Sequence, residues 1–414
     1  MSGLPTRVDV VVVGAGLAGL AAARRLTGHG LDVAVLEAAD AVGGRARTDR
    51  VDGLLLDRGF QLLNPAYPEA ARLLDLGALD LKAFGAGVVV ATGGRRTVLA
   101  DPRRAPAHAL SSLTAPGSLR EKAAFARWAA QVGFGNPRRL KAAPDEPLSA
   151  ALHRRGINGR LRRSVVEPFL AGVLAEDGQE SSRRFVDLLV RSFVRGTPSL
   201  PSGGIQAMPE QLAAALPAGC LHLGVRVTTV RGTSVSTDAG VVSSSAVMVA
   251  TDPRTAVGLA GLPTVVLRGL TTFYHIADQP FTDSRMLHVD GDRRGPVINT
   301  AVVSNIAPSY AGGHGTLVAS TVLGVRGDGE TEQAVRAQLR LIYGHDPRRW
   351  QLVATYPVVD ALPAMLAPLT LRQPVALGDG VFVAGDHRDT ASIQGALVSG
   401  RRAADAVLRY LDIR

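Results

Sequence analysis

Two glycine motifs within the first fifty residues place the strongest constraint on the fold of this chain. The first motif, Gly-Ala-Gly-Leu-Ala-Gly at 14–19, follows a largely apolar run at 8–13 and precedes an alanine-rich stretch at 20–26. This order predicts a strand, a tight turn and a helix, which is the context that a dinucleotide-binding fingerprint requires. The glycines permit the turn, leave room for a pyrophosphate and let the helix pack closely on the strand. Unpaired N–H groups at the helix N-terminus would face the phosphates.

The carboxylate that such a fingerprint needs follows at the expected distance. A second predicted strand at 32–36 leads to Glu37, where a carboxylate can accept hydrogen bonds from both ribose hydroxyls. A turn that is merely rich in glycine would explain neither Glu37 nor the second glycine pair, Gly43-Gly44. We therefore expect nucleotide contacts from Gly14, Ala15, Gly16, Leu17, Ala18, Gly19, Glu37 and Ala38.

Three segments resemble motifs of one family of flavoproteins. The segment 37–48, with its Gly-Gly-Arg at 43–45, resembles the diglycine-arginine signature of the flavin amine oxidase and phytoene desaturase-like superfamily of FAD-dependent oxidoreductases. Segment 57–61 resembles the stretch that runs beneath the isoalloxazine ring in that family, and 381–404 resembles its closing FAD motif. The resemblance implies FAD contacts from Gly43, Gly44, Arg45, Gly59, Phe60, Gln61, Val227, Gly385, Asp386, Ile393, Gln394 and Ala396.

The closing motif carries two expectations and one departure from the family. In the family, the aspartate after Ala-Gly, here Asp386, binds the ribityl chain of FAD. The next helix directs its N-terminus at the flavin, where a positive dipole end stabilises the anionic reduced form. Gln394 stands where the family usually has a glutamate, so the role of Gln394 in a particular hydrogen bond is left open.

The resemblance also implies an architecture. We expect an α/β protein with a Rossmann-like FAD-binding domain, as in glutathione reductase-like two-domain flavoproteins, and an α+β substrate domain of mixed sheet with inserted helices. The FAD-binding domain would be discontinuous and comprise 1–80, 203–262 and 375–414. The substrate domain would comprise 81–202 and 263–374, with 105–200 mainly helical.

Composition limits the cofactor linkage and the compartment. Cys220 is the only cysteine, so no internal disulfide can form, and a reducing cytoplasm is expected. Some amine oxidases tether FAD through a cysteine beside the closing motif, whereas Cys220 lies far from that motif. We therefore expect non-covalent FAD. There is no uninterrupted apolar run of ~18 residues, so an ordinary transmembrane helix is not predicted, and we expect no signal peptide.

The net charge of +10 comes almost entirely from arginine, and much of the excess lies between 103 and 184. Aromatic residues form only 4% of the chain and no nucleic-acid module is visible, which argues against a nucleic-acid partner. A solvated helical surface is the default interpretation. Peripheral contact with an anionic membrane is the alternative, and it suits a lipid-soluble substrate.

Leu119, Ala123, Ala126 and Ala130 fall on one face of a helix predicted at 118–132.

The substrate is less constrained than the cofactor. True amine oxidases commonly place a lysine near flavin N5, but Thr272 or its neighbour Thr271 occupies the matching strand and no lysine follows Lys141. The branch that resembles phytoene desaturases is therefore favoured: a dehydrogenase or desaturase that passes a hydride from an apolar, isoprenoid-like or secondary-metabolite substrate to the flavin. An amine oxidase that uses O2, a non-redox isomerase and a prenyl-binding escort protein remain alternatives. The candidate catalytic residues are Gln61, Thr272, Tyr356 and His387, and the scattered histidines predict no metal site.

Overall fold

The apolar run near the N-terminus forms β1 (Val10–Val13), an inner strand of a six-stranded sheet in the computed structural model, which describes residues 4–413. β1 pairs in parallel with β2 (Val33–Glu37) on one side and with β13 (Ala246–Val249) on the other. The strand order is β19-β20-β13-β1-β2-β9, so segments from both ends and the middle of the chain share one sheet. The expected α/β class is confirmed. The remaining strands are β9 (Leu221–Leu223), β19 (Ala376–Gly378) and β20 (Val381–Val383).

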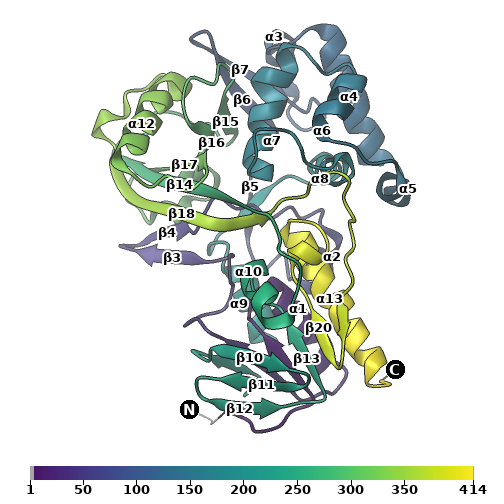
Figure 1. Cartoon of the computed structure of the whole chain (residues 1–414). Helices are drawn as coiled ribbons and strands as arrows, with labels where there is room; N and C mark the ends of the chain where they lie inside the picture. Colours follow the sequence, from purple (N-terminus) through teal and green to yellow (C-terminus); the bar gives the residue numbers. More distant parts are fainter. Residues whose placement is uncertain (1–3, 414) are drawn as a thin grey trace.

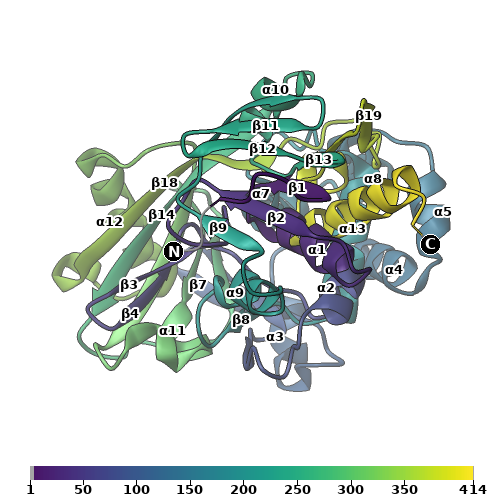
Figure 2. The same ribbon diagram turned by 90° about the horizontal axis from the view of Figure 1, so that it is seen from below.

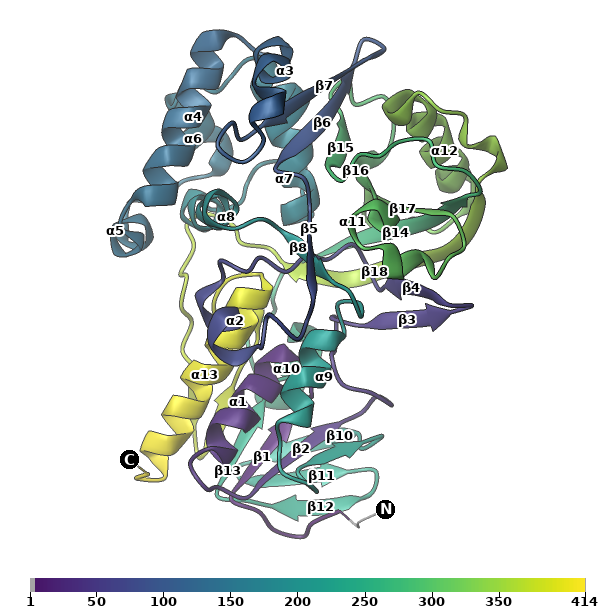
Figure 3. The same cartoon turned by 180° about the vertical axis from the view of Figure 1, so that it is seen from behind.

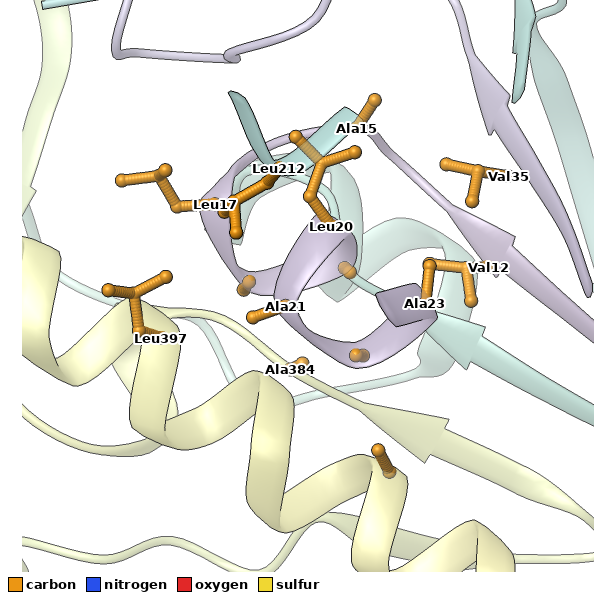
Figure 4. Close-up of a cluster of buried hydrophobic side chains, with 14 of the residues drawn as sticks. Val12, Ala15, Leu17, Leu20, Ala21, Ala23, Val35, Leu212, Ala384 and Leu397 are labelled. Carbon is orange, nitrogen blue, oxygen red and sulfur yellow. The ribbon is translucent and has the colours of Figure 1, made fainter. Parts of the chain in front are cut away.

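Alternate residues of β1 face opposite sides of this sheet. Val10 and Val12 belong to a core with α1 (Leu17–Thr27) and α13 (Ile393–Tyr410), part of which Figure 4 shows. The other two valines of β1 face α10 (Pro253–Ala260) and a three-stranded sheet, so the six-stranded sheet is covered on both sides (Figure 2). That smaller sheet comprises β10 (Val227–Arg231), β11 (Ser234–Thr237) and β12 (Gly240–Ser243), while α2 (Pro68–Leu73) and α9 (Ala207–Ala214) lie on the α1 side.

Small residues let α1 and α13 approach each other closely. A Cβ atom at Gly400 of α13 would overlap the backbone carbonyl of Ala18 in α1. A Cβ at Gly19 would likewise overlap the carbonyl oxygen of Gly14. The first helix is therefore fixed against both its own turn and the last helix.

A second, mixed sheet has seven strands in the order β18-β14-β17-β16-β15-β6-β7. One face packs on α12 (Gly329–Tyr343) through Val335, Leu339 and Ile342. The other face packs on the hairpin β3–β4 and on Tyr310. These elements are β3 (Thr48–Val51), β4 (Leu54–Asp57), β6 (Gly87–Thr92), β7 (Arg95–Ala100), β14 (Leu267–Ala277), β15 (Leu287–Asp290), β16 (Val297–Val302), α11 (Val303–Ile306), η3 (Pro308–Ala311), β17 (Thr316–Leu323), η4 (Pro347–Arg349) and β18 (Gln351–Pro363).

A helical region stands at the end of the molecule opposite to both chain termini (Figure 1). Its centre is the buried Trp128, whose Nε1 donates to Asp187 at 2.7 Å and so links α4 (Leu119–Phe134) to α8 (Arg183–Arg195). The region contains η1 (Pro106–His108), α3 (Ala109–Thr114), α4 (Leu119–Phe134), α5 (Pro137–Ala142), α6 (Leu148–Arg154), η2 (Arg162–Val166), α7 (Glu167–Leu174) and α8 (Arg183–Arg195); β5 (Leu81–Ala83) pairs with β8 (Ser199–Pro201) beside it.

The alanine face expected on the helix at 118–132 is not a core face. Leu119, Ala123, Ala126 and Ala130 are all exposed, whereas Trp128 on another face of α4 is buried. Periodicity identifies a face but does not say whether a partner covers it. The residue bounds of the two domains remain our proposal, and the hairpin β3–β4, which we assigned to the FAD-binding domain, packs on the seven-stranded sheet.

We predict that Gly400→Ala destabilises the protein by about 1–3 kcal/mol, because the new methyl group would force α13 away from Ala18. Gly258→Ala is the matched control: Gly258 is also helical, and a Cβ there meets no atom within 4 Å. The control should be neutral or slightly stabilising. Chemical denaturation of both variants measures the difference, and equal midpoints would contradict the close helix crossing.

Candidate active site

One cavity of about 1440 Å³ extends from the glycine turns to the helical region. Its first half, at the carboxyl ends of β1 and β2, is lined by Gly14, Gly16, Glu37, Gly43, Gly44, Arg45, Val227, Asp252, Gly385, Asp386 and Ile393. Its second half is lined by α3, α4, α7, α8 and strands β6 and β7. Pockets for small molecules usually measure about 300–1,000 Å³, so this space suits a larger ligand or two ligands together.

The first glycine turn leaves the N-terminus of α1 open to the cavity. Gly14 has a φ of +102°, and a Cβ there would lie 2.9 Å from the carbonyl oxygen of Ala250. Gly16, the N-cap of α1, has no atom within 4 Å of its Cβ position, so the chain leaves free space in front of it. No side chain caps the helix and no acidic residue lies in its first turn. Its free N–H groups and positive dipole end favour an anion at this place.

Glu37 lies at the end of β2 and its carboxylate is fixed by the backbone. One oxygen accepts from the Ala15 N–H at 2.7 Å and the other accepts from the Ala39 N–H at 2.9 Å. Each carboxylate oxygen can accept a further hydrogen bond. Glu37 therefore lines the cavity with spare acceptor capacity in a fixed position.

Arg45 joins the two distant cofactor motifs. Its guanidinium donates to Asp386 at 2.6 Å and to the carbonyl of Ala361 at 2.8 Å. Burial is the largest single effect and lowers the pKa of Arg45, but the combined attraction of Asp386, Asp252 and Asp360 raises it above its usual value. Arg45 is thus a permanent cation on the cavity wall.

A buried carboxylate anchors the segment that precedes Gly59. Asp57 accepts hydrogen bonds from Thr48 Oγ1 at 2.6 Å, from the Ile205 N–H at 3.0 Å and from the Tyr310 hydroxyl at 2.9 Å. Burial raises the pKa of Asp57 to about 6. This network fixes where the chain enters the cavity wall at Gly59.

Most of the predicted cofactor residues lie on one wall, and three lie behind it. Ala15 and Gly19 are buried in the turn, and Gln394 accepts from the Glu69 N–H at 3.0 Å, which ties α13 to α2. The remaining predicted residues line the cavity: Gly14, Gly16, Leu17, Ala18, Glu37, Ala38, Gly43, Gly44, Arg45, Gly59, Phe60, Gln61, Val227, Gly385, Asp386, Ile393 and Ala396.

Of the four catalytic candidates, only Gln61 is among the residues that line the cavity. Its Nε2 donates to the Arg45 carbonyl at 2.7 Å. Thr272 is buried and accepts from the Phe60 N–H at 3.1 Å, while the Tyr356 hydroxyl donates to Asp49 at 2.9 Å. His387 is buried, and neither ring nitrogen has a hydrogen-bond partner among residues 4–413. The last three are not among the residues that line the cavity, and a catalytic role for any of the four stays a prediction.

The second half of the cavity contains residues that no sequence motif indicated. Its wall is aliphatic and aromatic and includes Val88, Leu99, Phe125, Trp128, Leu161, Val165, Val166, Phe169, Leu170, Val173, Leu189, Val190, Phe193 and Val194. Asn299 on β16 is an exception: it is 4% exposed, and its Oδ1 has no hydrogen-bond partner in the described part of the chain. An isolated asparagine within a strand carries no spacing signal, so only the folded chain reveals it.

Most of this chain matches one known family of proteins. The family model described as flavin containing amine oxidoreductase matches residues 17–408. The chain belongs to this family. It is therefore a flavin-dependent oxidoreductase, which confirms the family and the enzyme class expected from the motifs.

Individual relatives match over short segments, whereas solved structures match over the whole fold. Putrescine oxidase of Kocuria rosea is 48% identical over 91 residues, which cover 21% of this chain and 19% of the relative. Protoporphyrinogen oxidase 2 of Arabidopsis thaliana is 46% identical over 76 residues, which cover 18% of this chain and 15% of the relative. The structure of cyclohexylamine oxidase from Brevibacterium oxydans has a TM-score of 0.69 at 18% identity and covers 98% of this chain and 99% of that one. The curated matches thus span less than a fifth of those two relatives, and the structural match shows the fold.

Residues 4–413 contain neither a membrane-spanning helix nor a metal site. No helix in this range is both long and apolar enough to cross a membrane. No group of three or more histidine, cysteine or acidic side chains in the same range is placed to hold a metal ion.

We predict an acid-sensitive contribution to stability from His387. Burial lowers its pKa to about 4, while an unfolded histidine titrates near 6.5. The unfolded state therefore binds the proton first, and the free energy of unfolding falls as the pH drops from about 6.5 towards 4. His387→Gln should flatten this fall by up to about 1.4 kcal/mol per pH unit.

Denaturation at several pH values measures the slope, with His29→Gln as the control because His29 is exposed. An unchanged slope in His387→Gln would show that this imidazole is not held neutral by burial.

Proposed function

We propose that the first half of the cavity binds FAD without a covalent link. The residues present fit such a cofactor in three respects: free space in front of Gly16, an uncapped helix N-terminus for the pyrophosphate, and the fixed carboxylate of Glu37 for the ribose. Cys220, the only cysteine, is buried and does not line the cavity, and burial raises the pKa of its thiol to about 11. A thiol in that place and protonation state supports non-covalent binding.

The chain's own residues would orient the ligands and exclude water. The segment 59–61 is held by the Phe60 N–H on Thr272 and by the Gln61 amide on the Arg45 carbonyl, so it forms a fixed wall. Phe60 packs edge-on against Phe84, with ring centroids 6.1 Å apart, at the transition to the apolar half. FAD, when bound, supplies a two-electron acceptor for a hydride. Placing a substrate C–H bond beside it in an apolar enclosure is then the protein's contribution.

The observation that carries the substrate proposal is the apolar lining of the second half of the cavity. A substrate that fills this half gains free energy by leaving water, as isoprenoid-like and other apolar metabolites do. Carboxylates are scarce there: among the described lining residues of the helical half, the only one is Asp101, which is paired with Arg103, and the other charged side chains are the cations Arg104 and Lys122. We therefore propose a dehydrogenase or desaturase that removes hydride from an apolar substrate. Asn299 would offer such a substrate one internal hydrogen-bond partner.

Oxidation of an amine is the second candidate function. It is supported by the family and by the named relatives, which include a putrescine oxidase and a cyclohexylamine oxidase. Against it stands the cost of moving a protonated amine into an apolar chamber without a free carboxylate. The absence of any lysine after Lys141 also separates this chain from the amine oxidases that use one.

We predict that Glu37→Ala weakens FAD binding by about tenfold or more, because a charge-assisted contact to the ribose is lost. Asp40→Ala is the matched control: Asp40 is a nearby carboxylate with a 90% exposed side chain. Flavin released on dialysis is measured by absorbance, and thermal unfolding of both apoproteins reports on the fold. Equal flavin retention in the two variants would remove Glu37 from the proposed site.

We predict that an isoprenoid alcohol or hydrocarbon bleaches the flavin absorbance under anaerobic conditions, while putrescine and cyclohexylamine do not. The apolar chamber binds the first group and excludes the charged amines. The test is single-turnover absorbance followed by readmission of air with a peroxide assay. Rapid bleaching by either amine, with peroxide released on reoxidation, would replace the first proposal by amine oxidation.

A further inference from the structure

We propose that the surface formed by α3 and α4 docks on an anionic lipid surface, with the cavity opening towards the lipid. The membrane thereby becomes the source of the substrate. The apolar nature of that substrate rests on the proposed function, whereas the docking itself rests on the surface alone. We call this surface the α3–α4 face and define it by Leu110, Leu113, Leu119, Ala123, Ala126, Ala130 and Phe134.

The face is unusually apolar for an exposed surface. Leu110, Leu119 and Phe134 are 79%, 68% and 66% exposed, and they are the three most exposed large apolar side chains in the described range. Leu113 follows Leu110 by one turn on α3 and is 59% exposed. Single exposed leucines are ordinary, but a contiguous group indicates an interaction site.

The apolar side chains of α4 form one continuous stripe. Leu119, Ala123, Ala126, Ala130 and Phe134 follow one another at steps of three or four residues, which places them on one side of a helix. The helix is thus amphipathic with an exposed apolar stripe, and Ala123, Ala126, Ala130 and Phe134 of this stripe also line the cavity where it meets the surface. Interfacial helices that lie in the plane of a membrane have this form.

The same part of the chain concentrates positive charge. Residues 101–142 contain eight lysines and arginines and two carboxylates, a net charge of +6 out of +10 for the whole chain. Glu121 is buried and accepts from the N–H groups of Gly159 and Leu161, and Asp101 is paired with Arg103. Four arginines are exposed and form no ion pair within residues 4–413: Arg120, Arg127, Arg138 and Arg139.

The cavity opens through this face. Leu110, Leu113 and Phe134 line the cavity and are at the same time largely exposed, so they mark its rim. Arg103 lies over the Phe134 ring at 5.5 Å from its centroid, which places a cation directly at the rim. Figure 3 shows α3 and α4 at the extremity of the molecule, where a flat surface can approach them.

Charge favours lipid over a second copy of this chain. In a dimer joined through this face, two segments that each carry a net charge of +6 would repel each other. Anionic headgroups, in contrast, are complementary to the arginines. The leucines and phenylalanine would enter the headgroup region, and the arginines would contact phosphates. An apolar solute in the acyl chains could then enter the cavity at Leu110 and Leu113 without crossing water.

Sedimentation of the flavin-loaded protein with phosphatidylcholine vesicles, with and without phosphatidylglycerol, tests the proposal. We expect binding only to the anionic vesicles, weakened by salt. Arg120→Gln/Arg127→Gln should weaken it by about 25-fold, roughly fivefold for each cation. Leu110→Ser/Leu119→Ser should weaken it by about tenfold or more. Flavin absorbance and thermal unfolding verify that each variant is folded.

Two control variants lie outside the face. Arg340→Gln/Arg349→Gln removes two exposed cations from α12 and η4, and Val241→Ser removes a 58% exposed apolar side chain from β12. Both should bind vesicles like the parent. The proposal fails if the parent does not bind anionic vesicles or if the control and face variants weaken binding equally. It also fails if the parent is a dimer that the leucine variant dissociates, since the face then joins two copies.

The outcome is independent of the redox chemistry. Vesicle binding by a protein that retains no flavin would leave the docking proposal intact and refute the proposed function. Flavin reduction by an apolar substrate in detergent, with no binding to any vesicle, would do the reverse.

Discussion

The close contact between the first and last helices governs the rest of this structure. α1 and α13 meet at Ala18 and Gly400 with no room for a side chain between them. This contact sets the position of the closing segment relative to the first glycine turn, and with it the position of Asp386 relative to Arg45. The cavity wall is therefore a product of backbone approach, and the ion pair across 341 residues of sequence follows from it.

The two halves of the cavity differ in the polarity of their walls. In the first half, backbone N–H groups, a carboxylate and a guanidinium stand in fixed positions, which suits a charged and hydrogen-bonding ligand. In the second half, side chains of several helices surround an apolar volume. The segment 59–61 separates them, and the buried Asp57 beneath it keeps that boundary in place. Such a division suits the two proposed ligands, a charged dinucleotide cofactor and an apolar substrate.

Features that depend on a few neighbouring residues, such as the glycine turns, could be predicted from the sequence. Features that depend on contacts between distant segments could not. The glycines at 14, 16 and 43 follow from backbone requirements that a few neighbouring residues determine, so their spacing was sufficient to place them. The exposed stripe on α4 has the same periodicity as a buried one, and only the fold shows that nothing covers it. Thr272 was selected by its place in a predicted strand, and the hydrogen bonds that Thr272 and Tyr356 form with Phe60 and Asp49 join segments far apart in the sequence, which no local pattern predicts. Asn299 belongs to no motif, so its place in the cavity wall could not be predicted from the sequence.

The strand order has a consequence for synthesis on the ribosome. β1, β2 and α1 come from residues 10–37, but β20 and α13 come from residues 381–410, more than 300 residues later. Until those residues are made, the alanine side of α1 lacks its cover and Arg45 lacks Asp386. Domains generally fold from the N-terminus as they are translated, yet here the earliest unit must wait for the latest. Flavin capture therefore has to await the synthesis of α13, and a nascent chain stalled before α13 would be an unprotected apolar intermediate open to chaperones.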